Sequence, residues 1–297
     1  MRMEPARILR GGQAFAPVAA FRHREGVEPL IAALRQHIAR IEQANAQFEA
    51  VKGRAEPWTS GLAEIDRNLP AQGLIRSGLH DVSPSAYGDQ PAAMGFALAL
   101  ALRRLADAQE RRPLLWCRLA AQEREHGRLY GHGLERLGLT RQRFVTIMLR
   151  KPQALLWTME EALKSGALGV VIGDADAAHA DLSVTRRLSL AAQAGASAGL
   201  LVFARADVAA SASQTRWKVS PVASFGPPHD AAAPGHPAWN IELTRARGGR
   251  PGQWIVEWQH AYHRFSLVPG FRGGAVHPWA DQARAPGAAQ GTGLRAG

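Results

Sequence analysis

The sequence has one cysteine and four lysines among its 297 residues, and these shortages exclude several classes of protein. A lone Cys117 leaves no disulfide framework and no cysteine-based metal site. No apolar run is long enough to cross a bilayer without a charge, and residues 1–12 lack the apolar centre of a signal peptide. We therefore expect a cytoplasmic protein that does not enter the membrane.

Because lysine is scarce, the positive charge is almost entirely arginine. Lys and Arg total 36 against 25 Asp and Glu, and the formal net charge is +11 at pH 7. This balance favours anionic partners such as nucleic acid. The same Arg- and Ala-rich composition also arises from a GC-rich genome, so charge alone leaves both interpretations open.

The stretch around which the chain is organised covers residues 74–105. It predicts a strand at about 78–82, a polar turn and a long apolar helix that begins near Pro91. This is the place of a P-loop in an α/β nucleotide-binding fold. A working P-loop needs glycines, a Lys for the phosphates and a Ser or Thr hydroxyl for Mg²⁺.

The turn itself lacks most of this chemistry. It contains one glycine and no lysine, Asp89 would repel phosphate, and Pro84 and Pro91 have no N–H to donate. We interpret it as a degenerate nucleotide loop and expect neither a cofactor nor a bound metal. The positions that define this loop are Ser83, Ser85, Gly88, Asp89 and Gln90.

The following residues alternate between apolar strands and helices, which indicates a mainly parallel sheet with helices on both faces. The predicted strands are 113–119, 143–149, 168–173 and 199–204, and the predicted helices are 122–137, 153–165 and 181–193. Residues 205–215 are predicted to be a mobile loop, and 216–223 a strand. Alternating residues at 239–245 and 253–259 predict a C-terminal antiparallel hairpin with an arginine-rich tip.

We divide the chain into a flexible arm (1–26), a helix and linker (27–56), a core (57–268) and a disordered tail (269–297). The early helix has a heptad seam that includes Ile31, Leu34, Ile38 and Ile41. The seam either packs on the protein's own core or docks on another protomer or a partner.

The order of these pieces resembles RecA-like proteins over about residues 27–265. Residues 58–69 with Gly73 resemble the segment before the P-loop strand, and LKSGALGVVIGDAD resembles a Walker B passage with Asp174 at the metal-side carboxylate. RLAAQEREHGRLYGHGLERLGL resembles the passage where RecA-like enzymes keep a catalytic glutamate. Within that superfamily, TRWKVSP, PPHDAAAPGHPAWNIEL and TRARGGRPGQW resemble the ImuA family.

The resemblance implies an α/β, RecA-like P-loop NTPase fold with a degenerate P-loop. It also implies an accessory role in SOS-induced translesion DNA synthesis, beside an inactive Y-family polymerase homologue and an error-prone replicative-type DNA polymerase. We therefore predict a non-catalytic factor that contacts proteins, with DNA contact and self-association left open. The alternatives are a RecA-type DNA-binding ATPase and a cell-division inhibitor of the SulA type.

For several side chains, the sequence allows both a functional and a structural role. Asp174 is either a Walker-B-like carboxylate or a structural relic. Glu123 and Glu125 are catalytic candidates or a solvated helix face, and His126 and His132 do not share the helix face that a zinc site needs. The candidate DNA or partner contacts are Arg205, Arg216, Trp217, Lys218, Arg245, Arg247 and Arg250, with Trp217 either stacking on a base or lying in the core.

Overall fold

The computed structural model describes residues 9–10, 13–14, 58–206, 210–224, 226, 233 and 235–268. The seam residues Ile31, Leu34, Ile38 and Ile41 lie outside the described residues, as does the predicted tail. The proposed boundaries of the arm, the seam helix and the tail therefore stay predictions.

The described strands form one sheet in the order β11-β10-β9-β8-β3-β7-β6-β4-β5-β1-β2. The six neighbours from β8 to β5 run parallel, whereas β9, β10 and β11 continue the sheet antiparallel. The fold is thus α/β with C-terminal antiparallel strands, as predicted. The strands are β1 (Leu9–Arg10), β2 (Gln13–Ala14), β3 (Leu79–Pro84), β4 (Leu114–Leu119), β5 (Phe144–Leu149), β6 (Val170–Ala175), β7 (Ala198–Phe203), β8 (Thr215–Val222), β9 (Ala238–Ala246), β10 (Gly252–Gln259) and β11 (Arg264–Leu267).

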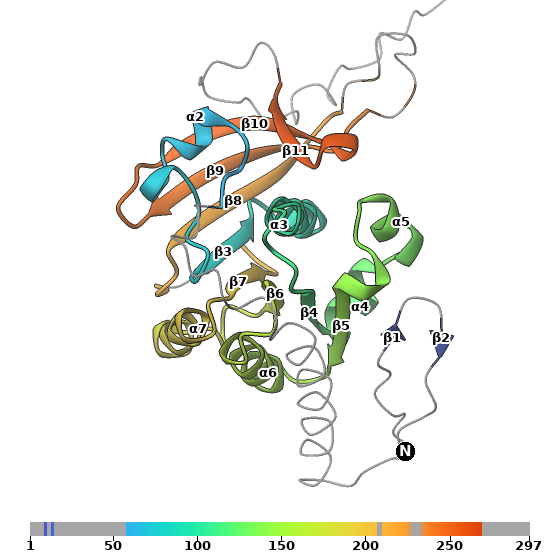
Figure 1. Cartoon of the computed structure of the whole chain (residues 1–297), viewed down its shortest axis with the longest axis vertical. Helices are drawn as coiled ribbons and strands as arrows, with labels where there is room; N and C mark the ends of the chain where they lie inside the picture. Colours follow the sequence, from blue (N-terminus) through green and yellow to red (C-terminus); the bar gives the residue numbers. More distant parts are fainter. Residues whose placement is uncertain are drawn as a thin grey trace, which may run out of the picture.

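Helices cover both faces of the parallel part (Figure 1). One face carries α3 (Gln90–Leu105), which packs with β8–β11 in a core that includes Phe96, Trp217 and Trp239. The other face carries α6 (Pro152–Lys164) and α7 (Leu182–Ala194) over a second core. The short helices are α2 (Ala63–Asp66), α4 (Ala120–His126), α5 (Gly131–Arg136) and the 3₁₀ turns η2 (Pro70–Gln72), η3 (Tyr87–Asp89), η4 (Arg141–Arg143) and η5 (His260–Tyr262).

Local signals in the sequence account for the long helices. Asp181 caps α7, because its carboxylate accepts the Val184 N–H at 2.8 Å. The five α6 residues predicted to point inward are all buried, namely Leu155, Leu156, Met159, Ala162 and Leu163. Within the residues that the structure describes, no helix is both long and apolar enough to cross a membrane.

The helix predicted over 122–137 is instead two helices, α4 and α5. The helix is interrupted at Gly127, which has φ of +83°. Arg118 donates from Nη1 to the Gly127 carbonyl at 3.2 Å, so a buried side chain reaches the break from β4. No proline marks the end of a helix at Gly127, and the prediction missed the break because helical periodicity continues on both sides.

Strand β3 is wholly buried, yet it carries three polar side chains, His80, Asp81 and Ser83. His80 Nε2 lies 2.9 Å from the Ile75 carbonyl, and its Nδ1 lies 2.8 Å from the Thr215 hydroxyl. A carbonyl only accepts, so Nε2 donates and the neutral ring accepts at Nδ1. Burial lowers the pKa of His80 to about 4.

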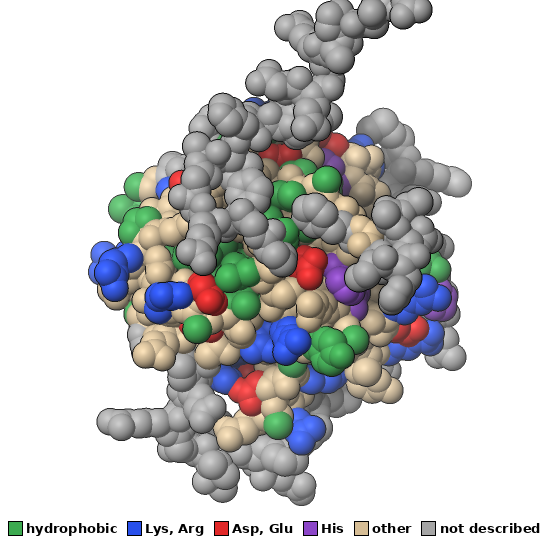
Figure 2. Space-filling model, turned by 90° about the horizontal axis from the view of Figure 1, so that it is seen from above, with side chains coloured by type: hydrophobic (Ala, Val, Ile, Leu, Met, Phe, Trp, Pro, Cys, Tyr) green, Lys and Arg blue, Asp and Glu red, His purple; other side chains and the backbone are tan. Residues whose placement is uncertain are grey.

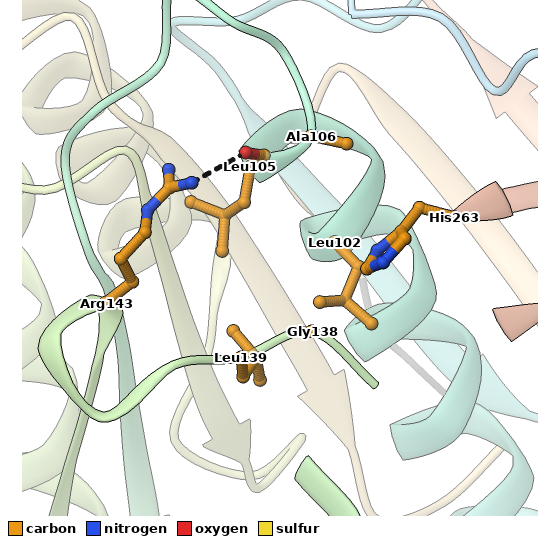
Figure 3. Close-up of a pocket in the computed structure, with 7 residues that line it drawn as sticks. All are labelled: Leu102, Leu105, Ala106, Gly138, Leu139, Arg143 and His263. Carbon is orange, nitrogen blue, oxygen red and sulfur yellow. Dashed lines mark hydrogen bonds between the residues drawn. The ribbon is translucent and has the colours of Figure 1, made fainter. Parts of the chain in front are cut away.

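After α5, the chain meets the C-terminal strands at a small cavity of about 230 Å³ (Figure 3). Its wall includes Leu102 and Leu105 of α3, Gly138, Arg143 and His263. Gly138 has φ of +90°, and a Cβ there would lie 2.1 Å from the His263 ring. Two features therefore require glycine at position 138: the left-handed backbone conformation and the closeness of the His263 ring.

We expect Gly138→Ala to lower the free energy of unfolding by about 2–3 kcal/mol, because it strains the backbone and displaces His263. Chemical denaturation of the purified chain measures this loss. Gly131→Ala is the matched control, since a Cβ at Gly131 meets nothing within 4 Å. Equal stability of the two variants would contradict the packing described here.

We expect His80 to make the folded state sensitive to acid. A histidine whose folded pKa is depressed contributes stability that is fully present above the unfolded value of 6.5 and is lost as the pH falls toward about 4. The loss over that window is about 3 kcal/mol. Denaturation of wild type and His80→Gln at pH 7 and pH 4.5 isolates this effect, and a stability difference that does not change with pH would refute it.

Candidate functional site at the carboxyl edge of the sheet

The β3–α3 turn satisfies its own backbone donors. Ser85 donates its N–H to the Val219 carbonyl at 2.8 Å, and the Ala86 N–H goes to the Asp89 carboxylate at 3.0 Å. Asp89 in turn donates its N–H to the Ala86 carbonyl at 3.1 Å. The groups that would close on phosphate in a P-loop are thus partly occupied, and a carboxylate takes the place of the anion.

The spacing of the P-loop motif aligns Gly88, Asp89 and Gln90 with its Gly, Lys and Ser or Thr. On this alignment, which rests on the predicted degenerate nucleotide loop, Asp89 takes the position of the lysine that neutralises phosphate. Gln90 is buried, and its side-chain amide has no hydrogen-bond partner among the described residues. Ser83 belongs to β3 rather than to the turn, and its hydroxyl donates to the Trp217 carbonyl at 3.1 Å.

Asp174 lies inside β6 and is 1% exposed. Its carboxylate accepts the Trp116 indole N–H and the Leu119 N–H, each at 3.1 Å, and it lies 3.5 Å from Arg118 Nε. Burial raises the pKa of Asp174, and the Arg118 charge opposes that shift. Because neighbours occupy both oxygens, the geometry supports the structural interpretation of this Walker-B-like residue.

The neighbouring acids and histidines also have partners. Glu123 pairs with Arg128 at 2.9 Å, and Glu125 accepts a hydrogen bond from the Tyr87 hydroxyl. His126 lies 3.9 Å from Glu125. In the part of the chain that the structure describes, no three His, Cys, Asp or Glu side chains are grouped to hold a metal ion.

The candidate DNA contacts on β8 are buried or half-buried. Trp217 is 1% exposed and its ring centroid lies 5.6 Å from that of Phe96, so the interpretation that it stacks on a base is wrong. Arg216 pairs with buried Asp81 at 3.4 Å, and Lys218 is half-buried. Arg205 is exposed at the end of β7.

The three arginines predicted at the hairpin tip also separate. Arg247 and Arg250 are exposed, but Arg245 is half-buried and donates to the carbonyls of Ser211 at 2.9 Å and Ser213 at 2.7 Å. The prediction of an exposed cluster is therefore wrong for Arg245. Its role is to hold the β7–β8 connection against the sheet.

That connection was predicted to be mobile, but its described end is anchored. Ser211, Ala212 and Ser213 are buried, and the Ser213 hydroxyl donates to Asp81 at 2.9 Å. The sequence reasoning missed the buried polar residues Asp81 and Arg118. A charge inside an otherwise apolar strand was the signal for both, in LHDV and WCRL.

We expect Asp174→Asn to lower the free energy of unfolding by about 3–5 kcal/mol, because Arg118 would keep an uncompensated buried charge. Asp176→Asn is the control, since Asp176 is half-exposed and an asparagine can still accept the Ala178 N–H. Urea denaturation compares the two. Similar small losses in both variants would show that the ion pair does not support the carboxyl edge.

The comparisons with known proteins agree with the family resemblance. No family model matches the chain. Protein ImuA of Caulobacter vibrioides, from two strains, is 32% identical over 221 residues, which cover 70% of this chain and 87% of each relative. Among solved structures, SulA from Pseudomonas aeruginosa is 25% identical with a TM-score of 0.33, over 42% of this chain and 97% of that chain. On the identity and coverage of the Caulobacter relatives, the chain belongs to the ImuA family.

Proposed function

We propose that this chain is a non-catalytic accessory factor in SOS-induced, error-prone translesion DNA synthesis. Membership of the ImuA family supports a role in damage-inducible mutagenesis. The observation that carries the non-catalytic part is the β3–α3 turn, where Asp89 stands in the lysine position and accepts the Ala86 N–H. A site arranged in this way attracts neither phosphate nor its magnesium ion.

We also propose that the core is RecA-like, with a P-loop that has lost its phosphate chemistry. The strand order β8-β3-β7-β6-β4 supports this, because the strand that leads into the turn lies inside a parallel sheet with helices on both faces. The position of Asp174 on β6, at the same carboxyl edge, supports it as well.

The proposed partners are an inactive Y-family polymerase homologue and an error-prone replicative-type DNA polymerase. Exposed Arg247 and Arg250 at the β9–β10 tip give this chain a basic surface for an acidic partner. Self-association through the seam of Ile31, Leu34, Ile38 and Ile41 remains a proposal, because the seam lies outside the described residues.

Gly88→Ala tests whether the turn still works as a P-loop. A Cβ at Gly88 meets nothing within 4 Å, so we expect normal folding and full complementation of damage-induced mutation in a strain that lacks the gene. An active P-loop needs this glycine for close approach to phosphate, so loss of induced mutagenesis in a stably folded variant would favour the ATPase alternative.

The double variant Arg247→Glu, Arg250→Glu tests the proposed partner surface. We expect it to reduce damage-induced mutation while the chain still melts cooperatively. Calorimetry with Mg-ATP completes the test, and we expect no binding in the micromolar range. If deletion left induced mutation unchanged and overproduction caused filamentous cells, the accessory role would be wrong and the cell-division inhibitor favoured.

A further inference from the structure

All three tyrosines of the chain are strongly exposed. Tyr87 is 68% exposed, Tyr130 70% and Tyr262 67%. The large tryptophans, in contrast, lie mostly in the core, as with the indoles of Trp58, Trp116, Trp217, Trp239 and Trp258. A single exposed ring is ordinary on a protein surface, so three such rings indicate a ligand-binding surface only where they lie near one another.

The three tyrosines lie around the α4–α5 segment. Tyr87 donates to Glu125 of α4, and Tyr130 directly precedes α5. Tyr262 belongs to η5, whose His260 faces Tyr130 across an open hollow of about 430 Å³ with an apolar floor of Leu134 and Leu137. We call the surface formed by Tyr87, Tyr130, His260 and Tyr262 the tyrosine face.

Arginines accompany each ring of the tyrosine face. The Arg264 guanidinium lies 4.8 Å from the centroid of the Tyr262 ring, and that tyrosine is 67% exposed. Arg136 lines the hollow beside Tyr130, and the charge of Arg205 acts on the Tyr87 hydroxyl. On the right side of Figure 2, where α5 and η5 lie in Figure 1, Lys, Arg and His groups stand among exposed hydrophobic ones.

Two of the acidic groups nearby are paired with arginines of the same segment. Glu123 pairs with Arg128, and Glu135 pairs with Arg141 at 2.7 Å and lies 3.6 Å from His132. Glu125 accepts the Tyr87 hydroxyl. Glu123 and Glu135 are therefore paired with arginines within the segment, whereas Glu125 is bonded to a neutral phenol, and Arg136, Arg205 and Arg264 lie beside the rings.

We propose that the tyrosine face binds single-stranded nucleic acid. Exposed rings stack on unpaired bases of any sequence, and neighbouring arginines contact the phosphates. Duplex bases stay stacked on each other, so they cannot use the rings in this way. A protein ligand is less favoured, because the rings carry arginines rather than the broad apolar rim of a helix-binding groove.

This inference goes beyond the accessory role, since the purified chain would bind an oligonucleotide without any polymerase partner. It also moves the nucleic-acid contact away from Trp217 and Arg245, whose side chains the fold engages internally. Of the residues predicted from sequence for DNA contact, Arg205 alone belongs beside the tyrosine face.

The test is fluorescence anisotropy of the full chain with a labelled oligothymidine of about 20 nucleotides at low salt. We expect Tyr130→Ala and Tyr262→Ala each to weaken binding by about 5- to 100-fold. Tyr130→Phe and Tyr262→Phe keep the ring and should bind within about twofold of wild type. Leu182→Ala and Leu190→Ala, on exposed positions of α7, are the controls and should leave binding unchanged.

Arg264→Gln should weaken binding and reduce the slope of log affinity against log salt by about 0.7, as expected for one lost single-strand phosphate contact. Thermal melting confirms that every variant is folded, which exposed substitutions of this kind permit.

Three outcomes would overturn the proposal: no binding by the folded wild type, equal binding by the alanine variants, or tighter binding of a matched duplex. If wild type bound no oligonucleotide and the tyrosine variants no longer bound a polymerase-like partner, the tyrosine face would be a protein-binding surface instead. Oligonucleotide binding without any effect of gene deletion on induced mutation would overturn the accessory role alone.

Discussion

The buried ion pair between Arg118 and Asp174 connects strands β4 and β6 with the end of helix α4. Moving both charges out of water is costly, and the cost is offset only when the remaining polar atoms find partners. Trp116 and Leu119 donate to the carboxylate, and Arg118 Nη1 donates to the Gly127 carbonyl, whereas Arg118 Nη2 is buried without a hydrogen-bond partner among the described residues. The pair thereby joins β4 to β6 and contacts the chain at Gly127, where α4 ends.

At the same edge of the sheet, two carboxylates are engaged by the protein's own groups. Asp89 accepts a backbone N–H that a bound anion would otherwise take, and Asp174 is engaged with an indole and a guanidinium. Both carboxylates act on the protein's own groups. An accessory role in the ImuA family is consistent with such an edge, because contacts with other macromolecules need no triphosphate.

The arginines of this chain divide into two groups by the direction of their side chains. Arg118, Arg216 and Arg245 hold strands and connections together through Asp174, Asp81 and the β7–β8 carbonyls. Others, among them Arg247, Arg250 and Arg264, are exposed. Net charge therefore overstates the basic surface, and the exposed tyrosines locate a proposed nucleic-acid contact better than arginine content does.

By itself the sequence determined the α/β alternation, the inward face of α6, the Asp181 cap and the antiparallel hairpin. These features follow from local rules, since periodicity, caps and strand alternation depend on residues close in the chain. It also carried the family resemblance that the Caulobacter relatives confirm.

Only the tertiary structure decided that Trp217 lies against Phe96, that Arg245 turns toward Ser213, and that the helix breaks at Gly127. Each of these outcomes depends on a group brought from far along the chain. Whether an arginine or an indole faces water or the interior is settled by the packing of distant segments, which no local pattern records.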